Sequence, residues 1–207
     1  MKLYGNPGST CTRKVLTTLA EKGASADFVE IDLAKGEQKS AEHRKHQPFG
    51  VVPALDDNGF EMFESRAIIR YLDDTLPGPK LTPSDPKQKA KMEQWTSVEY
   101  SYFTPHAMKI IYQKLLYPMR GMATDMKVVD DAKAELGKTL DIMERELGRQ
   151  PFLAGEQFSL ADISYMPYIE YLFAGQEGEL IQSRPHVAMW WKRISERPSW
   201  QKVTGKA

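Results

Sequence analysis

Three side chains that could do chemistry follow one another at Ser9, Thr10 and Cys11, where a helix is predicted to begin. A helix N-terminus has unpaired backbone N–H groups and the positive end of the helix dipole, so it stabilises a nearby anion. Two hydroxyls and a thiol at such a position predict either an anion-binding turn or a nucleophile at Cys11. The simpler alternatives are that Ser9 or Thr10 only caps the helix and that Cys11 packs against a helix face.

Two further positions carry groups that an extended ligand could bind. Pro53 stands at the start of a predicted strand, and a cis Val52–Pro53 bond would expose the N–H and C=O of Val52, although trans is the commoner form. Glu64 and Ser65 place a carboxylate and a hydroxyl at the start of another predicted helix. There they either bind a ligand or cap the helix, and the residue types leave both interpretations open.

Neither a metal site nor a phosphate loop is predicted. His43 and His46 lie three residues apart, but no acidic or sulfur cluster with ligand spacing accompanies them. Residues 5–8 form a turn that lacks the lysine and the spacing of a phosphate-binding loop. We therefore expect no metal and no resident cofactor.

The elements that must position these residues change character once along the chain. Residues 76–86 contain four prolines and a glycine, which neither a helix nor a central strand accommodates. We interpret residues 79–86 as a linker between domains at 1–78 and 87–207, the first α/β and the second all-α. In the first domain the predicted elements are strands at 2–4, 28–33, 53–55 and 60–63 and helices at 12–22 and 66–76. In the second domain they are helices at 87–116 and 125–147, a helix that begins at 159, and a helix at 186–196.

Three local patterns refine this division. The Asn58-Gly59 pair favours positive φ and predicts a hairpin between two strands. Pro105 predicts a kink in the long helix after the linker. Ser159 with Asp162 three residues later has the spacing of a capping box.

The composition excludes several classes of function. The 207 residues carry 28 basic and 28 acidic side chains, so no net charge attracts nucleic acid or an anionic membrane. Hydrophobic residues make up 41 %, enough for a packed core, and no apolar run of about 18 residues predicts a membrane span. A single cysteine cannot form an internal disulfide, which is typical of a reducing compartment, so we expect a cytoplasmic protein.

Together these motifs resemble those of the cytosolic glutathione transferase family, most closely its serine-using, phi-like branch. The resemblance spans nearly the whole chain, through ordered motifs at residues 2–13, 36–39, 47–55, 63–68 and 152–162. It implies a thioredoxin-like N-terminal domain that binds glutathione and an all-helical bundle that supplies a second-substrate pocket. It also implies an enzyme that conjugates the glutathione thiolate to electrophilic hydrophobic compounds, as in detoxification.

The resemblance assigns roles to the candidate residues. By analogy, Ser9 is the catalytic hydroxyl that hydrogen-bonds the glutathione sulfur. Seven further residues would bind glutathione: Lys39 and Gln38 at its glycyl carboxylate, Val52 and a cis Pro53 at its cysteinyl backbone, Glu64 and Ser65 at its γ-glutamyl end, and Thr10 beside Ser9. Val51 stands where this branch usually carries glutamine, and Gln38 where histidine is common, so we expect an altered affinity for glutathione.

The remaining expectations concern the second substrate and the assembly. Tyr102, Phe103 and His106 could line an apolar pocket for the electrophile, or the aromatic residues could pack between helices. Phe49 stands where related transferases insert an aromatic side chain into a partner subunit. The resemblance therefore implies a homodimer, without nucleic acid or membrane partners.

A hydroxyl is sufficient to activate a thiol. A thiol with a pKa of about 8.5 needs about 2 kcal/mol of extra stabilisation to be half ionised near neutral pH. One hydrogen bond to a charged group contributes about 1.5–3 kcal/mol, and a helix terminus adds up to about 1 kcal/mol. Two other functions remain open: a thioltransferase or peroxidase that forms a mixed disulfide at Cys11, and a non-catalytic carrier of hydrophobic ligands.

Overall fold

A computed structural model describes residues 1–206, which form two compact units. One unit holds residues 1–81 together with 197–206, and the other holds residues 82–196. The chain passes between the units near the expected linker at 79–86, but its last helix belongs to the first unit. None of the helices formed by residues 1–206 combines the length and the apolar character needed to cross a membrane.

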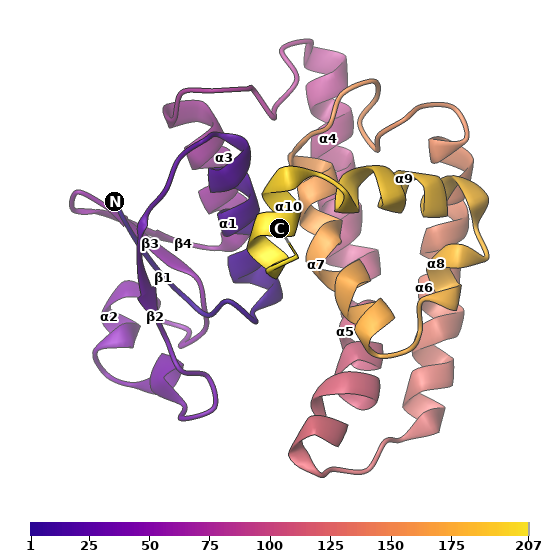
Figure 1. Cartoon of the computed structure of the whole chain (residues 1–207), viewed down its shortest axis with the longest axis horizontal. Helices are drawn as coiled ribbons and strands as arrows, with labels where there is room; N and C mark the ends of the chain where they lie inside the picture. Colours follow the sequence, from indigo (N-terminus) through magenta and orange to yellow (C-terminus); the bar gives the residue numbers. More distant parts are fainter. Residues whose placement is uncertain (207) are drawn as a thin grey trace. The chain divides into compact units, whose positions relative to one another are not determined.

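The first unit has the order of strands and helices that the sequence predicts (Figure 1). Its elements are β1 (Lys2–Gly5), α1 (Thr10–Glu21), β2 (Asp27–Glu30), a 3₁₀ turn (Glu37–Lys39), α2 (His43–His46), β3 (Ala54–Asp57), β4 (Phe60–Phe63) and α3 (Ser65–Thr75). The strands form one sheet in the order β2-β1-β3-β4, with β1 and β2 parallel and the other neighbours antiparallel. Positive φ angles at Asn58 and Gly59 turn the β3–β4 hairpin as predicted. The thioredoxin-like fold class is confirmed.

Apolar side chains between the sheet and two helices form the core of this unit. Leu3 and Leu55 come from β1 and β3, Val15 from α1, and Ile68 and Leu72 from α3, and all five are almost completely buried. α1 and α3 lie side by side on one face of the sheet, and α2 lies on the other (Figure 1). Burial of this apolar surface stabilises the layer from which the loops at the strand ends project.

The second unit is helical, as expected. Its helices are α4 (Pro86–Val98), α5 (Thr104–Ile111), α6 (Met126–Leu147), α7 (Leu160–Ala174), α8 (Glu179–Gln182) and α9 (Pro185–Ser195). The single helix predicted at 87–116 contains two π-helical segments, one between α4 and α5 at Glu99–Phe103 and another at Tyr112–Leu116. Pro105 lacks an N–H, and its ring would collide with a carbonyl of the preceding turn, so the helix widens just before the position where a kink is predicted.

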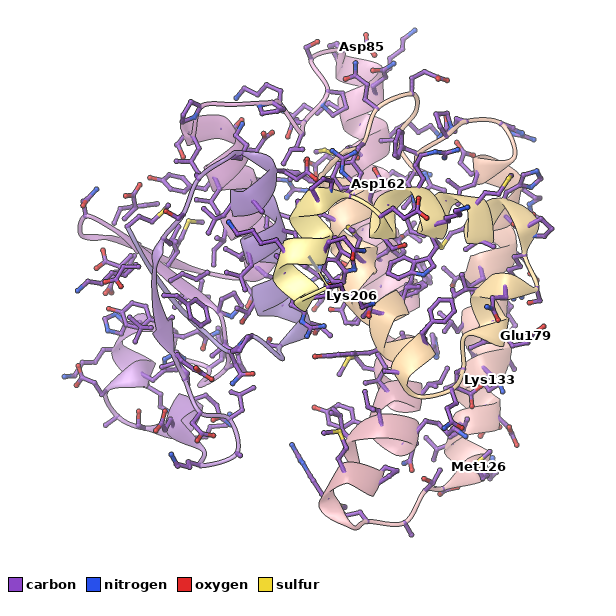
Figure 2. The ribbon with its side chains drawn as sticks, in the orientation of Figure 1. Asp85, Met126, Lys133, Asp162, Glu179 and Lys206 are labelled. Atoms are coloured by element: carbon purple, nitrogen blue, oxygen red, sulfur yellow. The ribbon has the colours of Figure 1, made fainter. Side chains whose placement is uncertain are left out.

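The start of α7 carries the predicted capping box. Asp162 is completely buried, and its carboxylate accepts hydrogen bonds from the N–H groups of Leu153 (3.1 Å) and Ser159 (2.9 Å). The Ser159 hydroxyl (3.1 Å) and the indole N–H of Trp190 (2.8 Å) donate to the same carboxylate. Burial raises the pKa of Asp162, and the hydrogen bonds oppose that shift. Asp162, labelled in Figure 2, thus joins α7 to the preceding loop and to α9.

The last helix, α10 (Pro198–Thr204), packs on α1. The Arg197 guanidinium donates two hydrogen bonds of 2.7 Å to the Glu21 carboxylate, and the Ser199 hydroxyl donates to it as well. Burial alone would raise the pKa of Glu21, but these hydrogen bonds and the charge of Arg197 outweigh it, so the pKa lies below the usual 4.5. The domain expected at 87–207 therefore loses its last residues to the first unit, because Glu21 and Arg197 pair across 176 positions of sequence.

Candidate functional site

Several loops of the first unit meet at one end of the sheet. β1 ends beside the end of β2, where Gly5 pairs with Glu30, and beside the start of β3, where Tyr4 pairs with Ala54. β4 ends at the same place, because Phe63 also pairs with Ala54. The loops that begin or end there, with the first residues of the helices and the 3₁₀ turn that they lead to, contain Ser9, Thr10, Gln38, Lys39, Val52, Pro53, Glu64 and Ser65. We call this group of eight residues the sheet-end site.

Asn6 fixes the turn between β1 and α1. Its side-chain amide donates to the carbonyl of Ile31 (3.0 Å), and its side-chain oxygen accepts from the N–H of Gly8 (2.9 Å). The Asn6 carbonyl accepts from the N–H of Ser9 (2.9 Å). Gly5 must precede it, because an added Cβ would lie 2.6 Å from the Thr12 side chain. The turn itself therefore sets the position of Ser9, and this role of Asn6 is not among the predictions made from the sequence.

Ser9 caps α1 through its side chain. Its hydroxyl oxygen accepts a hydrogen bond from the N–H of Thr12 (3.3 Å), as the capping interpretation predicts. A hydroxyl accepts through a lone pair and still has a hydrogen to donate, so capping and binding of an anion are compatible. Thr10 and Cys11 follow on the first turn of α1, and both are half-buried like Ser9. Cys11 is a free thiol.

The Val52–Pro53 bond is cis, as the resemblance implies. Val52 is 8 % exposed, and among residues 1–206 none hydrogen-bonds its backbone N–H or C=O. Unpaired backbone groups at a sheet end can pair with an extended ligand as an added strand would. The conditional prediction made for Val52 therefore has the backbone geometry that it requires.

One residue of α2 and the residue that follows this helix bind the backbone of Val51. The imidazole of His43 donates from Nε2 to the Val51 carbonyl (2.7 Å), and the side-chain oxygen of Gln47 accepts from the Val51 N–H (3.3 Å). His43 and Gln47 are both buried. In the sequence, His43 is a candidate only for a metal site, and Gln47 has no predicted role. Their spacing of four, which places them on one helix face, is the signal that could have linked them to this loop.

The 3₁₀ turn at Glu37–Lys39 packs against the loop before Val51. The Lys39 ammonium is exposed and donates to the Phe49 carbonyl (3.3 Å). Gly50 has φ of 63°, and a Cβ there would lie 2.9 Å from the Gln38 carbonyl, so only glycine permits this approach. The side-chain oxygen of Gln38 is buried without a hydrogen-bond partner among the described residues. The turn thus adds a positive charge and an unsatisfied amide to the site.

Asp32 closes the loop that leads from β2 to this turn. Its carboxylate accepts hydrogen bonds from the N–H groups of Ala34 (2.9 Å) and Lys35 (3.1 Å), and it pairs with the Lys35 ammonium. The backbone hydrogen bond from Lys35 contributes most to a pKa of Asp32 below its usual value. The Glu37 carboxylate accepts from the Asp32 N–H (2.8 Å), so the start of the 3₁₀ turn is fixed as well.

Glu64 begins α3 with an uncommon backbone. Its φ is 71°, in a region that residues other than glycine seldom adopt. Such a conformation costs about 1–3 kcal/mol and is concentrated at functional sites. Within residues 1–206 the Glu64 side chain caps nothing, which differs from the capping alternative. Ser65, the first residue of α3, is buried, and the N-terminus of this helix can bind an anion.

The residues considered for the second substrate lie in the second unit. Phe103 is completely buried and packs edge-on against Tyr165, with ring centroids 4.9 Å apart. It cannot line an open pocket, so for Phe103 the packing alternative is the correct one. Tyr102 and His106 lie elsewhere, in a groove against α6 whose other lining residues are Val98, Glu135, Lys138, Thr139 and Ile142.

The two neighbouring histidines of α2 have separate partners. His43 contacts Val51, whereas His46 stacks on Tyr4 with ring centroids 4.2 Å apart and contacts Glu61. The described part of the chain holds no group of three or more His, Cys, Asp or Glu side chains that could bind a metal ion. The sheet-end site offers instead the Ser9 hydroxyl, the N-termini of α1 and α3, the unpaired backbone N–H and C=O of Val52, and the Lys39 ammonium. These groups suit an extended ligand with anionic ends.

Comparison with known proteins identifies this combination of units. Residues 1–74 match the sequence profile of the glutathione S-transferase N-terminal domain, and residues 107–198 match that of the C-terminal domain. Glutathione S-transferase F12 of Arabidopsis thaliana is 38 % identical over 206 residues, which cover 98 % of this chain and 96 % of that protein.

Solved structures show the same likeness. Glutathione transferase F7 from Populus trichocarpa superposes with a TM-score of 0.95 at 39 % identity, covering 99 % of this chain and 98 % of that one. Glutathione S-transferase I from mais, in complex with an atrazine glutathione conjugate, has a TM-score of 0.92 at 38 % identity, covering 99 % and 96 %. The fold is that of a glutathione transferase. The chain belongs to the glutathione S-transferase family, and the relatives described here are plant phi-class (F) enzymes.

Proposed function

We propose that this glutathione transferase binds glutathione at the sheet-end site and stabilises its thiolate with the Ser9 hydroxyl. The thiolate then attacks an electrophilic hydrophobic compound. The position of Ser9 carries the proposal: its oxygen caps α1 while its hydrogen can still be donated. A sulfur anion beside Ser9 would accept that hydrogen bond and interact with the positive end of the α1 dipole. Thr10 offers a second hydroxyl on the same turn.

The energy available from these groups matches the requirement. Half ionisation of a thiol near neutral pH needs about 2 kcal/mol beyond its behaviour in water. A hydrogen bond to a charged group supplies about 1.5–3 kcal/mol and the helix terminus up to about 1 kcal/mol. Ser9 need not lose its own proton, so no general base is required. Catalysis then consists of thiol activation together with positioning of the two reactants.

The other residues of the site match the remaining parts of glutathione. Lys39, with Gln38 beside it, would bind the glycyl carboxylate, and the unpaired peptide of Val52 would pair with the cysteinyl backbone. The N-terminus of α3 at Glu64 and Ser65 would bind the γ-glutamyl carboxylate. The backbone of Val51 is already engaged by α2, and its apolar side chain offers no polar contact. We therefore expect weaker binding of glutathione than in a protein with glutamine at this position.

A comparison of Ser9→Ala with Thr10→Ala tests this proposal. We expect Ser9→Ala to lower turnover with a chlorodinitrobenzene and to raise the apparent pKa of bound glutathione, measured from the ultraviolet absorbance of its thiolate. Thr10→Ala should leave the thiol pKa within a few tenths of the unmodified protein. Unchanged turnover and thiol pKa in Ser9→Ala would exclude Ser9 as the activating group.

Cys11 supports a second candidate function, because it is a free, half-exposed thiol two residues after Ser9. In a thioltransferase its thiolate would attack oxidised glutathione, form a mixed disulfide and release one reduced glutathione. Intact mass after incubation with oxidised glutathione distinguishes the two chemistries. Conjugation requires no adduct at Cys11, and Cys11→Ser should retain it. If neither activity is found while hydrophobic ligands bind tightly, the chain acts as a carrier.

We further propose that the protein is a cytoplasmic homodimer that conjugates hydrophobic electrophiles in detoxification. The exposed aromatic ring of Phe49 supports an intersubunit contact, since 68 % of this residue is accessible. Tyr102 and His106 remain candidates for the second substrate. Light scattering of Phe49→Ser at micromolar concentration tests the dimer, and a monomeric variant is the expected result. Kinetics of Tyr102→Ala and His106→Ala with the electrophile varied test the pocket, with a raised KM for the electrophile expected.

A further inference from the structure

A cavity lies in the first unit, at the end of α1 remote from Ser9. It has a volume of about 250 Å³ and is lined by residues of α1, β1, β2 and α10 and of the connection from α1 to β2. Leu3 and Leu19, which are 0 % and 3 % exposed, form its floor. The remaining lining residues are Leu16, Ala20, Ala24, Ser25, Ala26, Phe28, Lys202 and Val203.

Small side chains keep this cavity open. The connection from α1 to β2 supplies Ala24, Ser25 and Ala26, and the last turn of α1 supplies Ala20, so no long side chain from these segments fills the space. A neighbouring cavity shares Ala20, Ala24, Ser25 and Lys202 with it and extends towards Pro198. The two therefore form one recess, whose apolar part lies at Leu16 and Phe28, and the exposed Ser25 and Lys202 give it contact with solvent.

Lys202 gives this recess its charge. It is the one charged residue in either lining among the described residues, and its ammonium has no carboxylate partner within residues 1–206. An apolar interior beside one cation is complementary to a molecule with an apolar body and one negative group. An apolar cavity of about 150 Å³ can hold a benzene ring, so this volume is sufficient for one ring with a short chain.

We propose that the recess binds a small organic carboxylate, with one aromatic ring or a short alkyl chain inserted against Leu16 and Phe28 and the carboxylate beside Lys202. This ligand site is separate from the sheet-end site. Ala20 follows Ser9 by eleven residues, which at 1.5 Å per residue places them about 16 Å apart along α1. A ligand in the recess and glutathione can therefore be bound at the same time.

A ligand-detected NMR titration with phenylpropionate tests the proposal on the full chain. S-benzylglutathione is added first in excess, so that it occupies the sheet-end site if glutathione binds there as proposed. We expect phenylpropionate to bind with millimolar affinity or better. Lys202→Gln should weaken it about fivefold, the order of an exposed charge contact, and should leave the neutral analogue phenylpropanol unaffected. Lys192→Gln removes one exposed charge that lines neither cavity, and it should change nothing.

A second variant tests the apolar part of the recess. Ala24→Leu places a larger side chain at the cavity and should weaken both phenylpropionate and phenylpropanol at least tenfold, whereas Ala134→Leu on the exposed face of α6 should not. Circular dichroism checks that each variant is folded, and Lys202→Gln alters only an exposed side chain. Absence of binding, or binding that is insensitive to both Lys202→Gln and Ala24→Leu, would overturn the proposal. Because the variants locate the bound carboxylate, this result does not depend on the role of Ser9.

Discussion

Replacing His43 with alanine tests whether α2 positions the backbone that we assign to glutathione. The His43 imidazole is 3 % exposed and donates a 2.7 Å hydrogen bond to the Val51 carbonyl. Loss of a buried hydrogen-bond partner costs about 1–3 kcal/mol. In His43→Ala the loop before Val52 loses this restraint, and glutathione must order it on binding.

The expected effect follows from that energy. If about 1.4 kcal/mol of it appears in binding, the KM for glutathione rises about tenfold. The turnover number should change less than twofold, because Asn6 and not α2 holds the turn that carries Ser9. For the same reason the pKa of the bound thiol should stay constant. A merely destabilised protein would not show this separation of KM from turnover and thiol pKa.

The assay varies glutathione at a saturating electrophile and compares three proteins. His46→Ala is the matched control, because His46 belongs to the same short helix but contacts Tyr4 and Glu61 instead of Val51. His43→Gln retains a donor and should recover part of the affinity. Equal KM values in His43→Ala and His46→Ala, or a fall in turnover accompanied by a raised thiol pKa, would refute the positioning role.

Three further predictions follow from other contacts. Asp162→Ala leaves several buried donors without an acceptor, so we expect the free energy of unfolding in urea to fall by about 3–5 kcal/mol. The control Asp130→Ala, at an exposed position of α6, should lower it by about 0.5 kcal/mol or less. Similar losses in the two variants would contradict this account. The pKa of Glu21 is lowered by folding, so its stabilisation of α10 is complete above the usual 4.5 and is lost as the pH falls through the folded-state pKa. The protection factors of the α10 amides, which are their exchange rates corrected for the intrinsic pH dependence of exchange, should therefore fall in acid. Glu21→Gln should reduce that pH dependence, and an equal dependence in both proteins would refute the link. Gly50→Ala should raise the KM for glutathione, because its Cβ would lie 2.9 Å from the Gln38 carbonyl; an unchanged KM would show that this approach is not needed.

Features that depend on a few neighbouring residues could be predicted from the sequence. Asn58 and Gly59 can adopt positive φ, which defines their hairpin without help from the rest of the fold. Ser159 and Asp162 are three residues apart, so their hydrogen bond forms within one helical turn. The roles assigned to the residues of the sheet-end site came from the resemblance, since the residue types at Ser9, Thr10, Glu64 and Ser65 alone also allow plain helix capping.

Features that depend on distant contacts could not be predicted in this way. The pairing of Glu21 with Arg197 places α10 in the first unit, and no local pattern indicates it. Phe103 is buried against Tyr165, whereas its neighbour Tyr102 is exposed, because the two point to different sides of a helix whose orientation is set by packing. The hydrogen bond between His43 and Val51 also depends on the fold, because the conformation of the loop brings the Val51 carbonyl to the imidazole. The residue type alone does not predict that partner.

The two interpretations of Ser9 can be separated by a variant that keeps the cap favourable and removes the hydroxyl. Glycine is tolerated at an N-cap at a cost of only a few tenths of a kcal/mol, whereas alanine costs about 1 kcal/mol. Ser9→Gly and Ser9→Ala should therefore differ in their free energies of unfolding, yet both lack the donor to sulfur and should raise the pKa of bound glutathione equally. Thiol pKa values that are raised equally above that of the unmodified protein, with unequal stabilities, would assign the chemistry to the hydroxyl itself. If turnover instead followed stability, with Ser9→Gly almost fully active, Ser9 would serve only to begin α1, and the thiolate would depend on the helix N-terminus alone.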